Sequence, residues 1–375
     1  MFRVSQFMHE LLAPTPVGPH RNPPGPVVIW NLIRRCNLTC KHCYSISTDK
    51  DFPGELSTDE VFRVMDDLKG FRVPVLILSG GEPLLRPDIF DIGRRAKAMG
   101  FYVGLSTNGT LIDEAMAARI GEVGFDYVGI SIDGIGATHD KFRCRDGAFA
   151  ESMAGVRFCR ALGVKVGLRF TMTMDNAAEL PQMLELLEAE RIGKFYFSHL
   201  NYAGRGNKNR LDDATLAITR NAMDLLFEAA RRHPDWEVVT GNNDADGAYF
   251  LYWVRKHMPD KADHIAAKLR QWGGNASGVN VANIDNLGEV HPDTMWWHYR
   301  LGNVRDRPFS AIWADTSDPL MAGLKRHPRA VEGRCATCAW LESCNGNTRV
   351  RAERTTGNPW AEDPGCYLTD EEIAG

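Results

Sequence analysis

Short apolar runs alternate with amphipathic stretches between residues 27 and 200 of this chain. An apolar run of about 4–8 residues bounded by turn residues is typical of a buried strand, and a longer stretch with one apolar face predicts a helix. Six strands are predicted on this basis: Val27–Leu32, Val75–Ser79, Tyr102–Ser106, Tyr127–Ile132, Lys165–Met172 and Lys194–Leu200.

Helices are predicted in most of the intervals between these strands. The first, Thr58–Leu68, has Ser57 or Thr58 as its N-cap and two acids, Asp59 and Glu60, in its first turn. The others are Pro87–Met99, Asp113–Val123, Phe149–Leu162 and Ala178–Glu190. A strand, a crossover helix and a further strand, repeated in this way, predict a parallel sheet, either open and doubly wound or an incomplete barrel.

The pattern changes near residues 204–240. A polar, glycine-rich loop at 203–210 precedes one long predicted helix, Leu211–Arg232, with caps at Asp212 and Asp213, and His233-Pro234 ends it. The strand–helix alternation then stops, and short segments rich in Trp, Asn and Gly follow. The expected organisation is an N-terminal extension at 1–25, an α/β barrel domain at 26–235 and a small α+β domain at 236–375.

Composition and charge narrow the class of protein. Hydrophobic residues make up 44% and charged residues 25% of the chain, which is ordinary for a globular protein. The net charge of −4 gives no indication of a nucleic-acid partner, and no apolar run approaches the roughly 20 residues of a membrane span. The N-terminus lacks a signal-peptide pattern, so the nine cysteines indicate ligands rather than disulfides and a reducing cytoplasm is expected.

Three cysteines at C-x3-C-x2-C, Cys36, Cys40 and Cys43, follow the first predicted strand. Three thiolates can hold three irons of a cubane cluster and leave the fourth iron open, unlike the four-thiolate ferredoxin patterns. A structural zinc site with a fourth ligand is the alternative, although the ring of His42, beside Cys43, would normally point the other way. The sequence Gly80-Gly81-Glu82-Pro83 follows the second predicted strand.

The three-cysteine loop, the GGEP sequence and the aromatic Tyr44 beside Cys43 together resemble the radical S-adenosylmethionine (SAM) superfamily. The resemblance implies an incomplete (β/α)6 barrel, a [4Fe–4S] cluster on the three cysteines and SAM bound at the open iron. It also implies an enzyme in which one electron from the cluster cleaves SAM to methionine and a 5′-deoxyadenosyl radical. A non-enzymatic iron–sulfur carrier is a weaker alternative, because a carrier does not need SAM.

Candidate SAM contacts gather where successive predicted strands end. In parallel sheets and barrels, ligands bind at the carboxyl ends of the strands. Asn108-Gly109 and Asp133-Gly134 are alternatively plain turns, and Arg169 is alternatively an ion-pair partner. The candidates are Tyr44, Gly80, Gly81, Glu82, Ser106, Asn108, Asp133 and Arg169.

A second cysteine group, Cys335, Cys338, Cys344 and Cys366, supplies four thiolates and therefore predicts a closed site. It resembles the SPASM or twitch extension of radical SAM enzymes, which implies an auxiliary [4Fe–4S] cluster and thus two clusters in all. Four-cysteine zinc is the alternative. Two further SPASM ligand positions are replaced here by Asp293 and Thr348, so a second auxiliary cluster is not expected, and substrate is expected in part of the vacated space.

Two cysteines lie outside both groups. Cys159 has the spacing of a helical core residue and is expected to be buried. Cys144 lies on a loop at the predicted substrate end of the barrel.

Long tracts resemble the radical SAM enzymes of haem d1 biosynthesis: Pro23 to Cys36, the LSGGEPLLRPDIF stretch and Asn358 to Cys366. The resemblance implies an iron tetrapyrrole substrate, 12,18-didecarboxysirohaem, attacked at its propionates, and an electron donor such as a flavodoxin or ferredoxin. Haem-pathway decarboxylases and peptide-modifying maturases are the alternatives. Imidazole is a frequent axial ligand, which makes His199, His291 and His298 candidates. Arg143, Arg145 and Arg205 are candidates to bind carboxylates instead.

Overall fold

The computed structural model describes residues 1–19 and 25–375; Pro23 and Pro24, at the start of one of the tracts above, lie outside the described residues. Its centre is a ten-stranded sheet in the order β10-β9-β8-β1-β2-β3-β4-β5-β6-β7. Neighbours from β8 through β1 to β7 are parallel, and β9 and β10 are added antiparallel at one edge. The predicted parallel sheet is therefore confirmed.

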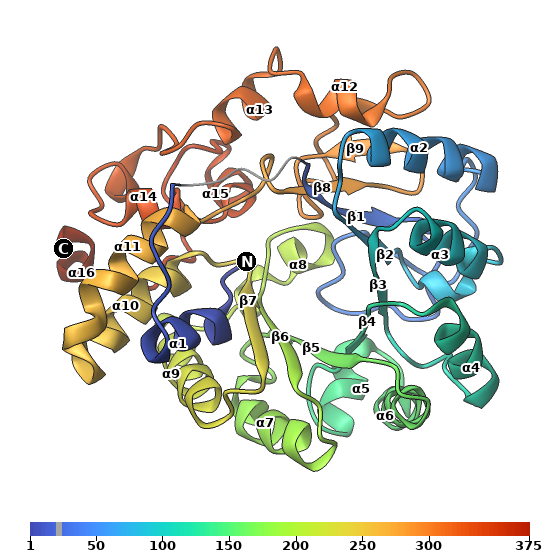
Figure 1. Cartoon of the computed structure of the whole chain (residues 1–375), viewed down its shortest axis with the longest axis horizontal. Helices are drawn as coiled ribbons and strands as arrows, with labels where there is room; N and C mark the ends of the chain where they lie inside the picture. The colour runs from blue at the N-terminus through green and yellow to red at the C-terminus, as the bar shows by residue number, and fades with distance from the viewer. Residues whose placement is uncertain (20–24) are drawn as a thin grey trace.

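The strands of this sheet are short and largely apolar, as expected for strands buried on both faces. Helices lie around the outside of the curved sheet in Figure 1. The strands are β1 Val27–Asn31, β2 Val75–Ser79, β3 Tyr102–Thr107, β4 Tyr127–Ser131, β5 Val166–Met172, β6 Lys194–His199, β7 Glu237–Gly241, β8 Val281–Ile284, β9 Glu289–His291 and β10 Gly302–Asn303.

The helices between strands follow the expected caps and apolar faces. Helix α2 begins after Ser57, whose side chain accepts a hydrogen bond from the Glu60 amide in a complete capping box, so this predicted start is confirmed. The outer helices are α2 Thr58–Gly70, α3 Ile89–Ala98, α4 Glu114–Val123, α5 Ala137–Arg143, α6 Ala148–Ala161, α7 Leu180–Ala189 and α9 Leu216–Arg232.

The long helix begins later than predicted. Helix α9 starts at Leu216, because the Thr215 hydroxyl accepts from the Ile218 amide, and Asp212 belongs to a separate 3-10 turn, Arg210–Asp212. The alternation also does not stop near residue 235, which corrects the prediction: β7 pairs with β6, and α10 Ala245–His257 and α11 Ala262–Trp272 follow. The sheet thus crosses the predicted domain boundary, and the boundary itself stays a prediction.

The N-terminal segment packs onto the body of the protein. Helix α1, Val4–Leu12, contacts β7 and α9, and Phe2 forms an antiparallel bridge to Thr240. The buried Phe2 ring also packs against Trp272 of α11 at 5.3 Å. These contacts join the start of the chain to the sheet edge at β7 rather than leaving it as a separate extension.

The C-terminal part consists of short helices: α12 Phe309–Ala314, α13 Pro319–Leu324, α14 Leu341–Cys344, α15 Arg349–Thr356 and α16 Asp370–Ala374. A buried ion pair attaches it to the sheet. Arg351 binds both carboxylate oxygens of Asp363 at 2.6 and 3.0 Å, and it also donates to the carbonyls of Leu200, after β6, and Asn242, after β7. None of the described helices combines the length and the apolar character needed to cross a membrane.

Candidate active site

The three-cysteine loop follows β1 and lies at the carboxyl edge of the parallel strands. Cys36 and Cys40 are 6% and 7% exposed and pack with Leu38. Burial raises the pKa of the Cys36 thiol, and the Glu82 carboxylate adds to the increase. Two elements fix the loop through its backbone: the Lys41 amide donates to the Phe142 carbonyl, and the Cys43 carbonyl accepts from the Arg205 amide at 2.9 Å.

Each of the three sulfurs has a different hydrogen-bonding partner. Cys36 Sγ accepts from the Leu38 amide at 3.4 Å, and Cys43 Sγ lies 3.3 Å from the Ser45 hydroxyl. Cys40 Sγ accepts from Nη1 of Arg143 at 3.5 Å. Hydrogen bonds to ligand sulfurs are among the features that tune a bound iron–sulfur cluster.

The two glycines after β2 permit close packing against the cysteine loop. A Cβ at Gly80 would lie 2.5 Å from the Ile33 carbonyl oxygen, and one at Gly81 would lie 2.3 Å from that of Arg35. The Gly81 amide donates to the Ile33 carbonyl at 2.6 Å. Backbone packing therefore accounts for glycine at both positions, and their contact with SAM stays a prediction.

Glu82 connects the β2 and β3 loops. Its side chain is fully buried and accepts from the Thr107 hydroxyl at 2.7 Å, the Asn108 amide at 2.8 Å and the Leu84 amide at 3.1 Å. Burial raises its pKa to about 7 despite these donors. Asn108 in turn donates to Asn37 Oδ1 at 2.9 Å. Glu82 thus holds the predicted site together, and its contact with a SAM ammonium stays a prediction.

Two predicted contacts meet on the inner face of the curved sheet, which is the face turned away from the outer helices. Arg169 on β5 donates to the Ser106 hydroxyl at 3.0 Å and lies over the ring of Tyr196 on β6. The Tyr44 hydroxyl reaches the same face and accepts from Asn31 at 2.8 Å. The sequence prediction missed Asn31 and Tyr196, although the alternation along each strand places them on this face.

Asp133 occupies a different environment from the one expected. One carboxylate oxygen accepts from the Thr171 amide at 2.6 Å, and the other forms an ion pair with Arg143. Both groups are almost completely buried. Asp133 is therefore paired with Arg143, the residue that donates to Cys40. The contact of Asp133 with a ribose stays a prediction.

The three arginines proposed for carboxylate binding all have protein partners. Arg205 donates to the carbonyls of Cys40 and Ser47, and Arg145 pairs with Glu151. Arg143 pairs with Asp133. Their present contacts hold the cysteine loop and its surroundings, so the structure presents none of them as a free carboxylate receptor.

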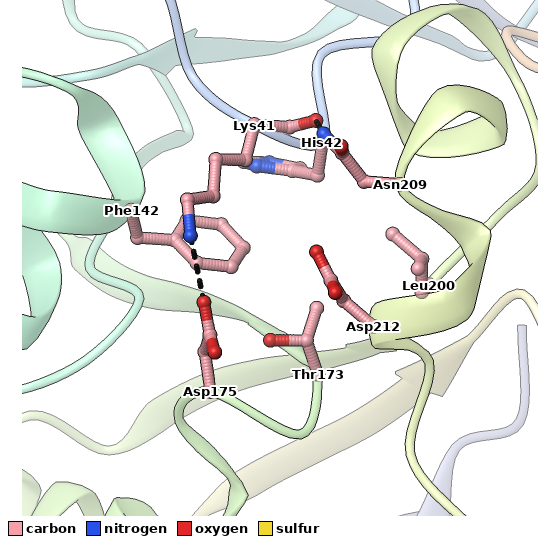
Figure 2. Close-up of a pocket in the computed structure, with 8 residues that line it drawn as sticks. All are labelled: Lys41, His42, Phe142, Thr173, Asp175, Leu200, Asn209 and Asp212. Atoms are coloured by element: carbon pink, nitrogen blue, oxygen red, sulfur yellow. Dashed lines mark hydrogen bonds and ion pairs between the residues drawn. The ribbon is translucent and has the colours of Figure 1, made fainter.

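A small pocket of about 220 Å³ adjoins the cysteine loop and is shown in Figure 2. Lys41 and Asp175 form an ion pair of 2.7 Å on one side, and the His42 ring lies 4.8 Å from that of Phe142. His42 Nδ1 is buried without a hydrogen-bond partner. The ring of His42 therefore packs into this pocket wall, consistent with its poor suitability as a fourth cysteine-site ligand.

The three candidate histidines occupy unequal positions. His199 packs against Phe197, on the outer face of β6, and its Nε2 lies 3.0 Å from Asp246 on α10, so the structure does not bring it to the inner face. His291 is fully buried on β9, opposite Asn283; its Nε2 makes no hydrogen bond but lies 3.5 Å from a carboxylate oxygen of Asp285. His298 Nε2 lies 3.3 Å from Glu353, and burial lowers the pKa of His298 to about 4.

Asp293 and Thr348, at the positions that lack SPASM ligands, both bond to other parts of the chain. Asp293 is half-buried and accepts from the Ser277 hydroxyl at 2.5 Å and the Met295 amide at 2.7 Å. The Thr348 hydroxyl donates to the Asn242 carbonyl at 2.9 Å. Both side chains have protein partners, and the expectation that substrate occupies part of the space vacated by a second auxiliary cluster stays a prediction. Trp297 lies between the rings of Tyr44, at 5.9 Å, and His291, at 5.8 Å.

The second cysteine group lines one cavity of about 390 Å³, with all four thiols in its wall. Burial raises the pKa of Cys344 well above its usual value and that of Cys366 to about 12. Cys338 Sγ accepts from the Trp340 amide at 3.4 Å. The remaining cysteines are separate: Cys159 is buried in α6, as expected, and Cys144 is exposed after α5.

The sequence pattern of the radical SAM superfamily matches residues 30–187. A pre-heme d1 synthase of Dinoroseobacter shibae is 55% identical over 99% of this chain and 93% of its own length. The chain belongs to the radical SAM superfamily. An Fe-coproporphyrin III synthase of Methanosarcina barkeri is 48% identical over 93% of this chain and 89% of its own. The crystal structure of Streptococcus suis SuiB bound to S-adenosylmethionine has a TM-score of 0.73 at 14% identity, covering 93% of this chain and 79% of that one, which shows the fold alone.

As a radical SAM enzyme, this protein uses a [4Fe–4S] cluster and SAM. The residues present fit the cluster: three thiols lie on one loop, two of them buried, each with a hydrogen-bonding partner at its sulfur. No group of three His, Cys, Asp or Glu side chains in the described part of the chain is arranged around the position of a single metal ion. The four thiols of the second cysteine group line one shared pocket.

Proposed function

We propose that this radical SAM enzyme acts on the propionate side chains of an iron tetrapyrrole on the route to haem d1, with 12,18-didecarboxysirohaem as substrate. The observation that carries the proposal is the 55% identity, over nearly the whole chain, to a pre-heme d1 synthase. The identity of 48% to an Fe-coproporphyrin III synthase makes decarboxylation of the same class of substrate the second candidate.

Cys36, Cys40 and Cys43 would hold the cluster of the radical step. When bound, the cluster and SAM supply a carbon radical that removes hydrogen from an unactivated carbon of the substrate. The residues on the inner face do the remaining work: Arg169 and Ser106 offer donors to SAM, and the interlocked loops around Glu82 keep the site fixed. A site that is fixed in advance lowers the entropic cost of bringing the reacting atoms together.

The four thiols of Cys335, Cys338, Cys344 and Cys366 would hold a second [4Fe–4S] cluster that accepts the electron left on the substrate. Their shared, largely apolar cavity supports this assignment, because a cluster ligated by four cysteines has no open iron and is suited to electron transfer. A flavodoxin or ferredoxin in the cytoplasm is the proposed source of the first electron.

Of the candidate axial ligands, His291 has the most suitable placement. Its Nε2 has no hydrogen-bond partner, its ring stacks on Trp297, and Trp297 in turn reaches Tyr44 beside Cys43. A carboxylate oxygen lies near Nε2 in all three histidines, at 3.0 Å for His199, 3.3 Å for His298 and 3.5 Å for His291, so the contact with Trp297 on the inner face decides for His291. Replacing each histidine with Ala, with His9→Ala in α1 as a control, should change the bound tetrapyrrole spectrum most for His291. Three unchanged spectra would mean that the iron is held by another ligand.

The direct test incubates reduced, anaerobic protein with SAM and 12,18-didecarboxysirohaem and compares the product by mass with authentic pre-haem d1 and Fe-coproporphyrin III. The proposal predicts pre-haem d1 together with 5′-deoxyadenosine. Formation of Fe-coproporphyrin III supports the second candidate. Turnover of SAM with a peptide but with no tetrapyrrole would make the chain a peptide maturase.

A further inference from the structure

One sulfur of the first cysteine site receives a hydrogen bond from a full positive charge. Arg143, the last residue of α5, is 5% exposed and places Nη1 3.5 Å from Cys40 Sγ. The donors nearest the other two sulfurs, the Leu38 amide and the Ser45 hydroxyl, are neutral. The environment of the three ligands is therefore electrically asymmetric.

The position of this guanidinium is fixed from two sides. Nη2 of Arg143 forms an ion pair with Asp133, whose other carboxylate oxygen accepts from the Thr171 amide on β5 at 2.6 Å. The backbone of α5 is tied to the same loop, since the Phe142 carbonyl accepts from the Lys41 amide at 3.1 Å. Arg143 therefore cannot swing out to bind a substrate carboxylate without leaving Asp133 buried and unpaired, which is costly.

The net field of the Arg143–Asp133 pair at Cys40 is positive. The pair turns its positive end towards the sulfur, because Nη1 of Arg143 donates to Cys40 whereas Asp133 binds Nη2. Reduction of a [4Fe–4S] cluster adds one electron and one unit of negative charge. A nearby positive charge and an N–H···S hydrogen bond both stabilise the reduced form, and in a buried site such interactions are weakly screened.

We propose that Arg143 is a positioning residue that raises the reduction potential of the radical-SAM cluster through Cys40. The electron comes from an external one-electron reductant, the cluster gains it, and Arg143 keeps its proton and charge throughout. The proposal rests on membership of the superfamily and not on the identity of the substrate, so it can fail or succeed independently of the tetrapyrrole assignment.

The test is an EPR-monitored dithionite titration of the reconstituted full-length protein without SAM. The spectrum of the Cys36→Ala/Cys40→Ala/Cys43→Ala variant, which retains only the second site, is subtracted. Arg143→Gln keeps N–H donors but loses the charge, and the ratio of reduced to oxidised first cluster at a fixed potential should fall about tenfold, which is 59 mV for a one-electron couple. Arg143→Lys should shift it much less, and the control Arg157→Gln, in α6 and paired with Glu190, should not shift it.

An Arg143→Gln variant that holds full iron and keeps the wild-type potential would overturn the proposal. If that variant does not assemble the cluster, Arg143→Gln/Asp133→Asn removes both charges and avoids an unpaired carboxylate. Because Arg143, and not Asp133, donates to Cys40, the double variant should still shift the potential in the same direction, by less. Loss of iron in both variants would assign Arg143 to cluster assembly and would also overturn the proposal.

Discussion

The two cysteine groups of this enzyme are held in different ways. The first lies on one loop at the edge of the sheet and is locked by backbone hydrogen bonds and by glycines that allow close packing. The second is gathered from α14 and neighbouring loops, and the buried Arg351–Asp363 pair ties it to the strand ends. Under the proposed function, three ligands on one loop would leave an iron open for SAM and four ligands would close the second site, so the two groups would serve different steps.

The largest expected effect is loss of the first group. Replacing Cys36, Cys40 and Cys43 with Ala should lower the iron content from about eight to about four per chain, as expected for two cubane clusters. SAM cleavage should disappear, because the second group offers no open iron. Iron analysis and 5′-deoxyadenosine quantification check this, and retained cleavage would contradict the assignment.

The next effect probes what holds the second group. Arg351→Met leaves the fully buried Asp363 carboxylate without its partner and should destabilise the protein by about 3–5 kcal/mol. Denaturant unfolding measures it. Arg231→Met, which breaks an exposed pair with Glu228 in α9, serves as the control and should cost less than about 1 kcal/mol. Equal effects would show that the buried pair has no special role.

A smaller effect is expected at the glycine packing of the first group. Gly81→Ala introduces a Cβ against two backbone oxygens, which cannot move without shifting the cysteine loop, and should cost about 1–3 kcal/mol and slow SAM cleavage. Gly70→Ala at the end of α2 meets nothing within 4 Å and should be neutral or slightly stabilising. Thermal unfolding and SAM cleavage of the two variants decide between these outcomes.

The smallest effects are expected at the cysteines outside both groups. Cys144→Ser should leave the iron content and SAM cleavage unchanged, because this exposed thiol lies outside both sites. Cys159→Ala should cost about 1 kcal/mol of stability through a small cavity in α6, with full iron retained. A loss of iron in either variant would mean that the seven-ligand count is wrong.

The parallel sheet could be predicted from the apolar runs, and the cysteine spacing identified the superfamily. The joining of β8 could not, because Val281–Ile284 has only four residues and pairs with β1, near the other end of the sequence. In β7 only Val238 and Val239 are apolar, too few for an apolar run. Strand alternation could have placed His199 correctly: Tyr196 faces Arg169 on the inner face, so His199, three residues on, faces the helices.

Long-range side-chain pairs set the limit of prediction at the site. Nothing in the sequence around Arg143 indicates that it reaches Cys40, since the two are far apart in the chain and meet only after α5 folds back on the cysteine loop. Asp133 was likewise predicted as a cofactor contact from its place after β4, whereas its main partner is Arg143. The ends of strands can be predicted as site positions, but which polar groups pair there depends on tertiary packing.

The central claim is that the first group cleaves SAM and the second is needed only to complete the reaction. The most direct test is an anaerobic assay of Cys335→Ala/Cys338→Ala that quantifies 5′-deoxyadenosine and tetrapyrrole product in the same sample. The account predicts that SAM cleavage persists, at least in part, while product formation is lost. Product formation at the wild-type rate, or the presence of zinc alone at the second site after anaerobic isolation, would contradict it.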